Sequence, residues 1–199
     1  MPRKNRRNES TIVDAVSAPK LGARIRELRQ QRKLTLEGLA ELSRVSRAML
    51  SKLERGEKNP TLVVAAKIAS ALRVSLTSFL GTEEERRTVV VIPKERRMVF
   101  RDAETGFERQ LLSPTFESRT LEFVRHVIPH GASSGDLPPY RKGTEKYLVV
   151  EHGTLVVTIS GEDHRVGPGD ALYFEADAPH RFTNAGRGVC SYYLVISQR

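Results

Sequence analysis

Residues 34–60 read LTLEGLAELSRVSRAMLSKLERGEKNP, and this stretch decides the fold of the first part of the chain. Thr35 and Ser46 each precede apolar residues at helical spacing, so each is expected to cap a helix N-terminus. The pattern predicts two short helices joined by a tight turn, with the small Ala40 where the helices cross. Two helices in this arrangement can reach into the major groove of DNA.

The second predicted helix has two faces of different chemistry. Met49, Leu50 and Leu53 continue an apolar face that begins at Val45. The opposite face holds Arg47, Ala48, Ser51, Lys52 and Arg55. One interpretation of that face is a solvated surface of an ordinary helical hairpin, and the other is a surface that meets DNA.

Residues 21–80 resemble the Cro/repressor-type (XRE) helix-turn-helix family, through VSRAMLSKLERGEKNPTL and KIASALRVSLTSFL. The resemblance implies a five-helix domain that binds double-stranded DNA. Its helices would begin at Leu21 and after the caps Thr35, Ser46, Thr61 and Ser75. One residue departs from the family pattern. Arg44 stands in the turn between the second and third helices, where glycine is usual because the backbone favours positive φ.

Positive charge is concentrated in the first 80 residues. They hold 17 Lys and Arg against 7 Asp and Glu, whereas residues 81–199 hold 16 against 17. The charge therefore indicates a polyanionic partner for the first half alone. The basic residues 1–20 are expected to form a disordered arm, which either contacts DNA or only aids solubility.

Beyond a charged linker at residues 81–87, the hydrophobic period changes from 3.6 to 2. Short runs such as TVVVI, RTLEFVRHVI, KYLVV and VCSYYLVIS are separated by Gly, Pro, Asp or Ser clusters. These runs predict an all-β sandwich or barrel over residues 88–199. The change of charge and period also predicts two halves that separate cleanly.

The second half resembles a cupin, a small double-sheet β-barrel, most clearly in VGPGDALYFEADAPHRFTNAG. Its Pro179, His180 and Asn184 match the second cupin motif. The first motif is degraded, because it has no His-x-His pair and Lys146 takes the place of the expected Glu, with Glu145 one residue away. The expected fold class is multidomain α + β, with a five-helix bundle that contains the helix-turn-helix and a cupin-like double-sheet β-barrel.

The degraded motif separates two function classes. Some proteins with this order of modules resemble iron-dependent oxygenases, in which two His and a carboxylate hold the metal. Only His180 is left of such a set here, and a lone His binds no first-row metal tightly. We therefore expect a transcriptional regulator with no catalytic residues, metal or cofactor. A metal-dependent cupin enzyme of the oxygenase or epoxidase kind is the alternative.

The resemblance implies a homodimer on a roughly palindromic operator. Arg47 and Lys52 are the expected base contacts, because Arg and Lys suit the paired acceptors of guanine. Ala48 and Ser51 would lie where the helix comes closest to the groove. The expected phosphate contacts are Thr35, Ser46 and Arg55.

Six polar residues are expected near the mouth of the barrel: Tyr140, Arg141, Glu145, Tyr147, His180 and Asn184. A mixed set of this kind suits a small polar or zwitterionic metabolite as an effector. The alternative is that these residues only close the barrel and that the domain only dimerises.

Two further features of the sequence concern the compartment. The longest apolar runs, such as Val89 to Ile92, are far too short to span a bilayer. Cys190 is the single cysteine, which excludes an internal disulfide, and its alternating surroundings predict a packed strand residue. We expect a cytoplasmic protein without a membrane partner.

Overall fold

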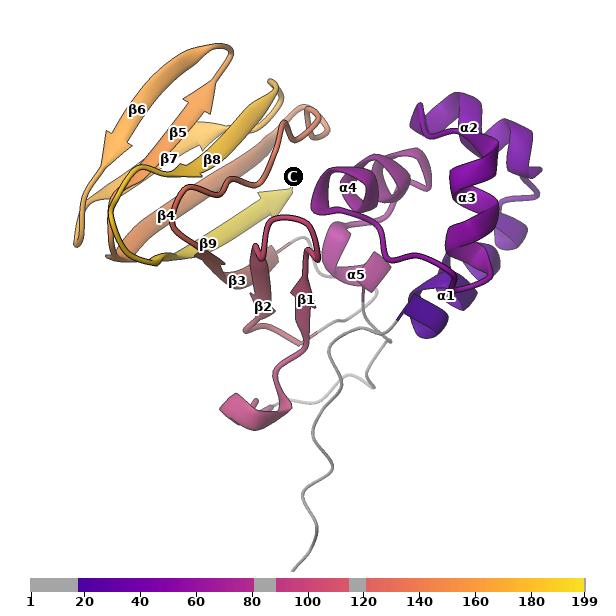
Figure 1. Ribbon diagram of the computed structural model, residues 1–199, viewed down its shortest axis with the longest axis horizontal. Coiled ribbons are helices and arrows are strands. Elements are labelled where there is room, and N and C mark those ends of the chain that lie inside the picture. The colour runs from indigo at the N-terminus through magenta and orange to yellow at the C-terminus, as the bar shows by residue number, and fades with distance from the viewer. Residues whose placement is uncertain (1–17, 81–88, 115–120, 199) are drawn as a thin grey trace, which may run out of the picture.

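The computed structural model describes residues 18–80, 89–114 and 121–198 (Figure 1). Five helices come first: α1 (Ala18–Gln31), α2 (Leu36–Ser43), α3 (Arg47–Glu54), α4 (Leu62–Ala71) and α5 (Leu76–Leu80). The first helix begins three residues before the predicted Leu21. The rest of the predicted arm and the linker 81–87 lie outside the described residues.

The predicted helix starts are confirmed by side-chain caps. Thr35 Oγ1 accepts a hydrogen bond from Gly38 N at 3.0 Å, and Ser46 Oγ accepts one from Met49 N at 3.2 Å. Thr61 and Ser75 cap α4 and α5 in the same way. The turn after α2 also has the predicted geometry, because Arg44 has a φ of 56°. A non-glycine residue in that conformation costs on the order of 1 kcal/mol, which the packed domain tolerates.

Helix α3 is held against α1 by one close backbone approach and one ion pair. A Cβ added at Gly22 would overlap the backbone oxygen of Leu53, so only glycine lets the two helices meet. At the end of α3, Glu54 accepts hydrogen bonds from Arg29 Nε and Nη2 at 2.7 and 2.9 Å. Both side chains are largely buried. These contacts fix the direction in which the exposed face of α3 points.

The remainder of the chain forms a short 3₁₀ helix, η1 (Lys94–Arg96), and nine strands. The strands are β1 (Val99–Arg101), β2 (Glu108–Leu111), β3 (Leu121–Ile128), β4 (Thr144–His152), β5 (Leu155–Ile159), β6 (Glu162–Val166), β7 (Ala171–Glu175), β8 (His180–Asn184) and β9 (Cys190–Gln198). They pair antiparallel in a six-stranded sheet of order β1-β2-β3-β9-β4-β7 and a three-stranded sheet of order β6-β5-β8.

Two details of the predicted β domain are corrected. In the part of the chain that the structure describes, strand pairing gives two facing sheets and no closed barrel. The predicted strand at Thr88–Ile92 is wrong, because residues 89–92 are irregular and Val89 and Val91 are exposed. Its β-branched residues favour a strand, but in the described part of the chain this run pairs with none of the nine strands.

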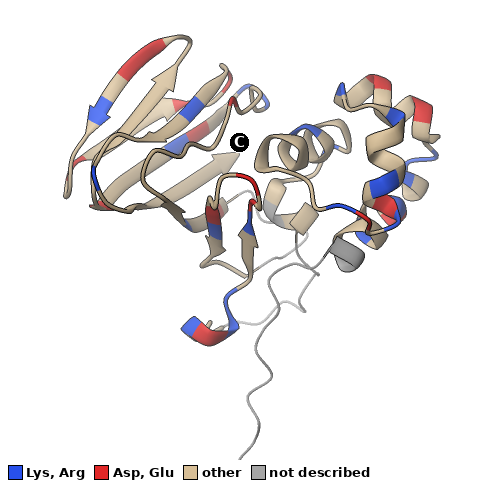
Figure 2. Cartoon of the chain, viewed as in Figure 1, with Lys and Arg blue, Asp and Glu red and all other residues tan. Residues whose placement is uncertain are grey.

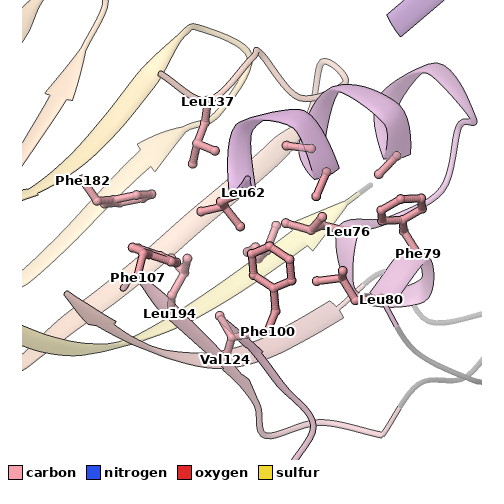
Figure 3. Close-up of a cluster of buried hydrophobic side chains, with 14 of the residues drawn as sticks. Leu62, Leu76, Phe79, Leu80, Phe100, Phe107, Val124, Leu137, Phe182 and Leu194 are labelled. Atoms are coloured by element: carbon pink, nitrogen blue, oxygen red, sulfur yellow. The ribbon is translucent and has the colours of Figure 1, made fainter. Parts of the chain in front are cut away.

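The helices and the sheets share one buried core, which the change of sequence pattern did not predict. Leu62 of α4 lies among Phe107, Leu137 and Phe182 of the β domain, and α5 packs beside Phe100 (Figure 3). At the same contact, Leu62 N donates a hydrogen bond of 2.9 Å to the buried carboxylate of Asp102. The clean separation of the two halves stays a prediction, and the shared core shows that α4 packs against the β domain as well as against the other helices.

Candidate functional site

The predicted DNA-binding residues lie together on the exposed side of α2 and α3. Arg47, Ala48 and Lys52 are exposed along α3, and Ser51 is partly exposed between them. The caps Thr35 and Ser46 stand at the N-termini of α2 and α3, where backbone N–H groups can also meet a phosphate. In Figure 1, α3 lies on the side of the helical domain that is turned away from the sheets. The structure thus leaves this face open to a partner.

Arg47, the leading candidate for base contact, is paired in the structure. Its guanidinium forms an ion pair with Glu37 of α2, and both side chains are exposed. The pKa of Glu37 is lowered, first by a hydrogen bond to the backbone amide and then by the positive charge of Arg47. An exposed pair of this kind contributes little to stability, so Arg47 can exchange Glu37 for a DNA group. Nothing in the helical pattern pointed to Glu37.

Arg55, a candidate for phosphate contact, is also held by neighbours. Its Nε donates to Glu57 Oε1 at 2.5 Å, and Nη1 donates to Ser51 Oγ. The hydrogen bond to Glu57 raises the pKa of Arg55, while Arg55 and then Lys52 lower the pKa of Glu57. Figure 2 shows acidic residues next to basic ones on these helices. The sequence signal for this counter-charge is Glu57 itself, two residues after Arg55.

The interior between the two sheets contains a buried amine beside the retained motif histidine. Lys146 Nζ lies 2.6 Å from His180 Nε2 and 4.2 Å from the centre of the Tyr140 ring. Burial lowers the pKa of Lys146 well below its usual value and lowers that of His180 to about 3. His180 is therefore neutral near pH 7. His180 Nδ1 then donates to Ala178 O at 2.9 Å, and Nε2 accepts from Lys146.

A second buried polar network lies deeper between the sheets. Arg109 forms an ion pair with Glu122 at 2.5 Å, and its Nη1 lies 3.0 Å from His126 Nε2. His126 Nδ1 lies 2.8 Å from the hydroxyl of Tyr192. Burial, followed by the charge of Arg109, lowers the pKa of His126 well below its usual value. Sequence reasoning missed this network, because its members come from three strands and share no motif.

The structure brings together only part of the predicted ligand set. Tyr140 and His180 have ring centres 5.9 Å apart, and Arg141 follows Tyr140 in the loop before β4. Glu145 and Tyr147 do not face the interior. They bond to each other on the outer side of β4, with Tyr147 Oη donating to Glu145 at 3.1 Å. Since side chains alternate along a strand, the inward position of Lys146 requires the outward position of both neighbours.

Asn184 is also placed elsewhere than expected. Its Nδ2 donates to the carbonyl oxygens of Ile128, Pro129 and Gly188 at 2.7–3.1 Å, and its Oδ1 accepts from Gly186 N. Both polar atoms of the side-chain amide therefore form hydrogen bonds to the backbone of loops near the C-terminal end of β8. In this structure Asn184 is a structural residue rather than a member of a ligand site.

The side chains around His180 do not fit a metal ion. The amine of Lys146 lies where a metal bound to Nε2 would sit, and the surrounding groups are the aromatic rings of Tyr140, Phe174 and Phe182. Among the described residues, no group of three His, Cys, Asp or Glu could hold a metal ion. This donor set gives no support to the alternative of a metal-dependent enzyme.

Tyr140 and Arg141 line a cleft between the two domains. The cleft is open to solvent and has residues of α4 and α5 as its opposite wall. The rings of Tyr140 and His180 therefore connect this cleft with the buried amine of Lys146. In the described part of the chain, no helix is long and apolar enough to cross a membrane.

Comparison with known proteins accounts for both domains. Residues 25–79 match the family HTH_3, described as helix-turn-helix, and residues 124–196 match Cupin_2, the cupin domain. The HTH-type transcriptional regulator SutR of Escherichia coli is 30% identical over 176 residues, which cover 88% of this chain and 93% of SutR. The HTH-type transcriptional regulator PuuR of Escherichia coli is 26% identical over 169 residues, covering 85% and 90%.

A solved structure extends the similarity to the fold of almost the whole chain. The HTH_3 family transcriptional regulator of Vibrio cholerae has a TM-score of 0.76 and 22% identity, and the match covers 94% of this chain and 99% of that one. These relatives are regulators, which agrees with the prediction of a regulator rather than an enzyme. The chain belongs to the family of helix-turn-helix transcriptional regulators that carry a C-terminal cupin domain.

Proposed function

We propose that the chain binds a palindromic DNA operator as a homodimer, with α3 of each copy in the major groove. The observation that carries this proposal is the open face of α3, where basic and small side chains lie on a helix fixed by Gly22 and the Arg29–Glu54 pair. Arg47 and Lys52 would read base edges, while Ala48 and Ser51 allow close approach. Thr35, Ser46 and Arg55 would contact phosphates. Such a regulator works beside the chromosome, in the cytoplasm.

Selection of binding sites from random DNA duplexes tests this assignment. We expect Arg47→Ala to relax base preference at one position per half-site and to cost about 1–3 kcal/mol. Arg55→Ala should weaken binding to all DNA sequences alike and reduce the salt dependence of the affinity. Arg165→Ala, at an exposed strand position of the cupin domain, is the control and should change neither. Unchanged specificity in Arg47→Ala would remove this residue from base readout.

The outer face of the large sheet is our candidate for the dimer contact. Tyr147, Val149 and Tyr173 are 46%, 45% and 49% exposed, and the two tyrosine rings pack with centres 5.0 Å apart. Paired carboxylate and guanidinium groups of Glu151 and Arg125 lie farther along the same sheet, at 2.7 Å. An apolar centre beside polar groups is the usual anatomy of an interface between copies.

Sedimentation of a matched pair of variants tests the dimer contact. Val149→Glu should shift the protein to a monomer and lower operator affinity, because the new charge would be buried without a partner. Val189→Glu adds the same charge at a position that is exposed but lies in a loop, and should leave the dimer intact. A dimeric Val149→Glu protein would place the interface elsewhere.

We further propose that the cupin domain senses a small polar effector. Of the six residues predicted for this role, Tyr140, Arg141 and His180 have positions that support it. Glu145 and Tyr147 lie on the outer face of the sheet, and Asn184 forms hydrogen bonds with loops. The arrangement that supports sensing is the contact of α4 with the cupin core, because a change in one domain reaches the other through packed side chains. The effect of an effector on operator affinity measures this coupling.

A further inference from the structure

The cleft between the helical and cupin domains has the features of a binding site in its own right. Its walls come from both domains: Ala66, Ala69 and Leu76 from the helices, and Pro138 and Tyr140 from the loop before β4. These side chains give it an apolar floor. Because the cleft is open to solvent, a small molecule can enter it without the strands moving apart. The space around Lys146, in contrast, is already filled by His180 and aromatic rings.

Two guanidinium groups stand at this cleft, one from each domain. Arg73 follows α4 and Arg141 follows Tyr140, and no acidic residue lies among the described residues that line the cleft. Within residues 18–80, 89–114 and 121–198, neither guanidinium has a carboxylate partner. By contrast, Arg29, Arg47 and Arg55 of the helical domain are each paired with a Glu side chain. Two cations without a counter-charge among the described residues, above an apolar floor, suit an amphiphilic anion.

We propose that this cleft binds a small organic anion, a carboxylate or sulfonate on a short apolar body. The acid group lies between Arg73 and Arg141, and the body lies on Ala66, Ala69 and Tyr140. Such a ligand contacts the helical domain and the cupin domain at once, so it stabilises one orientation of α4 and α5 relative to the sheets. Its influence on DNA binding rests on the proposed function, whereas its binding to the cleft does not.

Calorimetric titration of the full-length chain with four probes of equal length tests the site. The probes are hexanoate, hexane-1-sulfonate, hexylammonium and hexanol, at constant ionic strength. We expect saturable binding of at least one of the two anions and of neither of the other two probes. The relative affinity of the two anions identifies the acid group. Binding of hexanol or hexylammonium as tight as that of the anions, or no saturable binding of either anion, would overturn the proposal.

Three single variants of the full-length chain locate the bound anion. Arg73→Gln and Arg141→Gln should each lower the affinity for the anion by about tenfold or more, because each removes a charge-assisted hydrogen bond. Lys142→Gln is the matched control, since Lys142 is exposed next to Arg141 but does not line the cleft, and it should bind as the wild type does. Circular dichroism and thermal melting check that each variant is folded. Equal affinity in all four proteins would contradict the site.

Operator titrations with and without the bound anion separate the site from its regulatory role. A changed operator affinity that is lost in Arg73→Gln supports both the cleft and the proposed sensing function. Binding of the anion without any change in operator affinity supports the site but contradicts sensing through it. Coupling that is retained in Arg73→Gln and Arg141→Gln would place the effector elsewhere.

Discussion

Lys146 shows how a single residue changes the chemistry of the cupin interior. Its buried amine lies 2.6 Å from His180 Nε2, among the aromatic rings of Tyr140, Phe174 and Phe182. Burial lowers the pKa of the amine, so the unfolded chain binds one more proton than the folded chain between the two pKa values. The free energy of unfolding should therefore rise with pH in that range, and Lys146 should weaken the fold near pH 7.

The corresponding prediction concerns Lys146→Met. Below about pH 10, the usual pKa of lysine, the wild type should gain stability with pH relative to this variant, by up to about 1.4 kcal/mol per unit, because methionine binds no proton. Urea unfolding at several pH values measures the difference. Lys142→Met, which removes an exposed lysine, should show the same pH dependence of the unfolding free energy as the wild type. Parallel pH profiles for the wild type and Lys146→Met would mean that the buried amine is charged.

A second residue-scale prediction concerns the counter-charge of the DNA face. Glu37→Gln releases Arg47 and removes a negative charge near the phosphates, so operator affinity should rise. Glu41→Gln removes a charge from the same helix without touching Arg47, and should raise affinity less. Fluorescence anisotropy at several salt concentrations compares the two. Equal changes in both variants would show that the Glu37–Arg47 pair does not restrain Arg47.

The placement of site residues could be predicted from the sequence only in part. The helical period placed Arg47, Ala48 and Lys52 on one exposed face, because position on a helix follows from spacing alone. In the cupin domain, the alignment of Lys146 with an inward-facing ligand position already required Glu145 and Tyr147 to face outward. The role of Asn184 could not be foreseen, since it depends on carbonyl groups more than 50 residues away.

At the scale of elements, caps and glycines explain why the helices lie where they do. Thr35, Ser46, Thr61 and Ser75 could be read from the sequence because each acts on an amide three residues ahead. The packing of α1 on α3 could not, because nothing near Gly22 in the sequence reveals the backbone of Leu53. Val89–Ile92 likewise has strand-forming residues, yet it pairs with none of the described strands, because pairing depends on the rest of the fold as well as on propensity.

Two glycine substitutions test the element-scale account in opposite directions. Gly22→Ala should lower the free energy of unfolding of the helical domain by about 1–3 kcal/mol, because its Cβ overlaps backbone that cannot turn away. Gly38→Ala, inside α2 with only ordinary contacts around its Cβ, should raise it by about 0.5–1 kcal/mol. Thermal and urea denaturation measure both. A tolerated Gly22→Ala would show that α1 and α3 can separate without cost.

In the whole molecule, the two domains are joined by a buried contact in addition to the chain that connects them. Asp102 accepts hydrogen bonds from Leu62 N in α4 and from Glu104 N in its own turn, both at 2.9 Å. Leu62 itself is buried among cupin side chains (Figure 3). The domain order and the two folds followed from the sequence, but this contact joins residues 40 apart that share no pattern.

Asp102→Ala tests how far this contact couples the domains. It should lower stability by about 1–3 kcal/mol, since a buried amide loses its acceptor. Hydrogen exchange should accelerate in α4 more than in β4, which shares no hydrogen bond with Asp102. Asp170→Ala, which removes a turn hydrogen bond inside the cupin domain alone, is the control. Uniform acceleration in both domains would show that Asp102 serves the cupin fold only.

The central claim, that α3 enters the DNA groove, can be tested most directly with a tethered cleavage reagent. Cys190 is buried and burial raises its pKa to about 11, so a cysteine introduced by Ala48→Cys can be labelled selectively with iron-EDTA. On a selected duplex, the labelled protein should cut at two symmetric positions about 10 base pairs apart, one for each copy of α3. The same reagent at Lys142→Cys should not cut. Absence of cleavage from position 48 by labelled protein that still binds the duplex, or equal cleavage from both positions, would contradict the account.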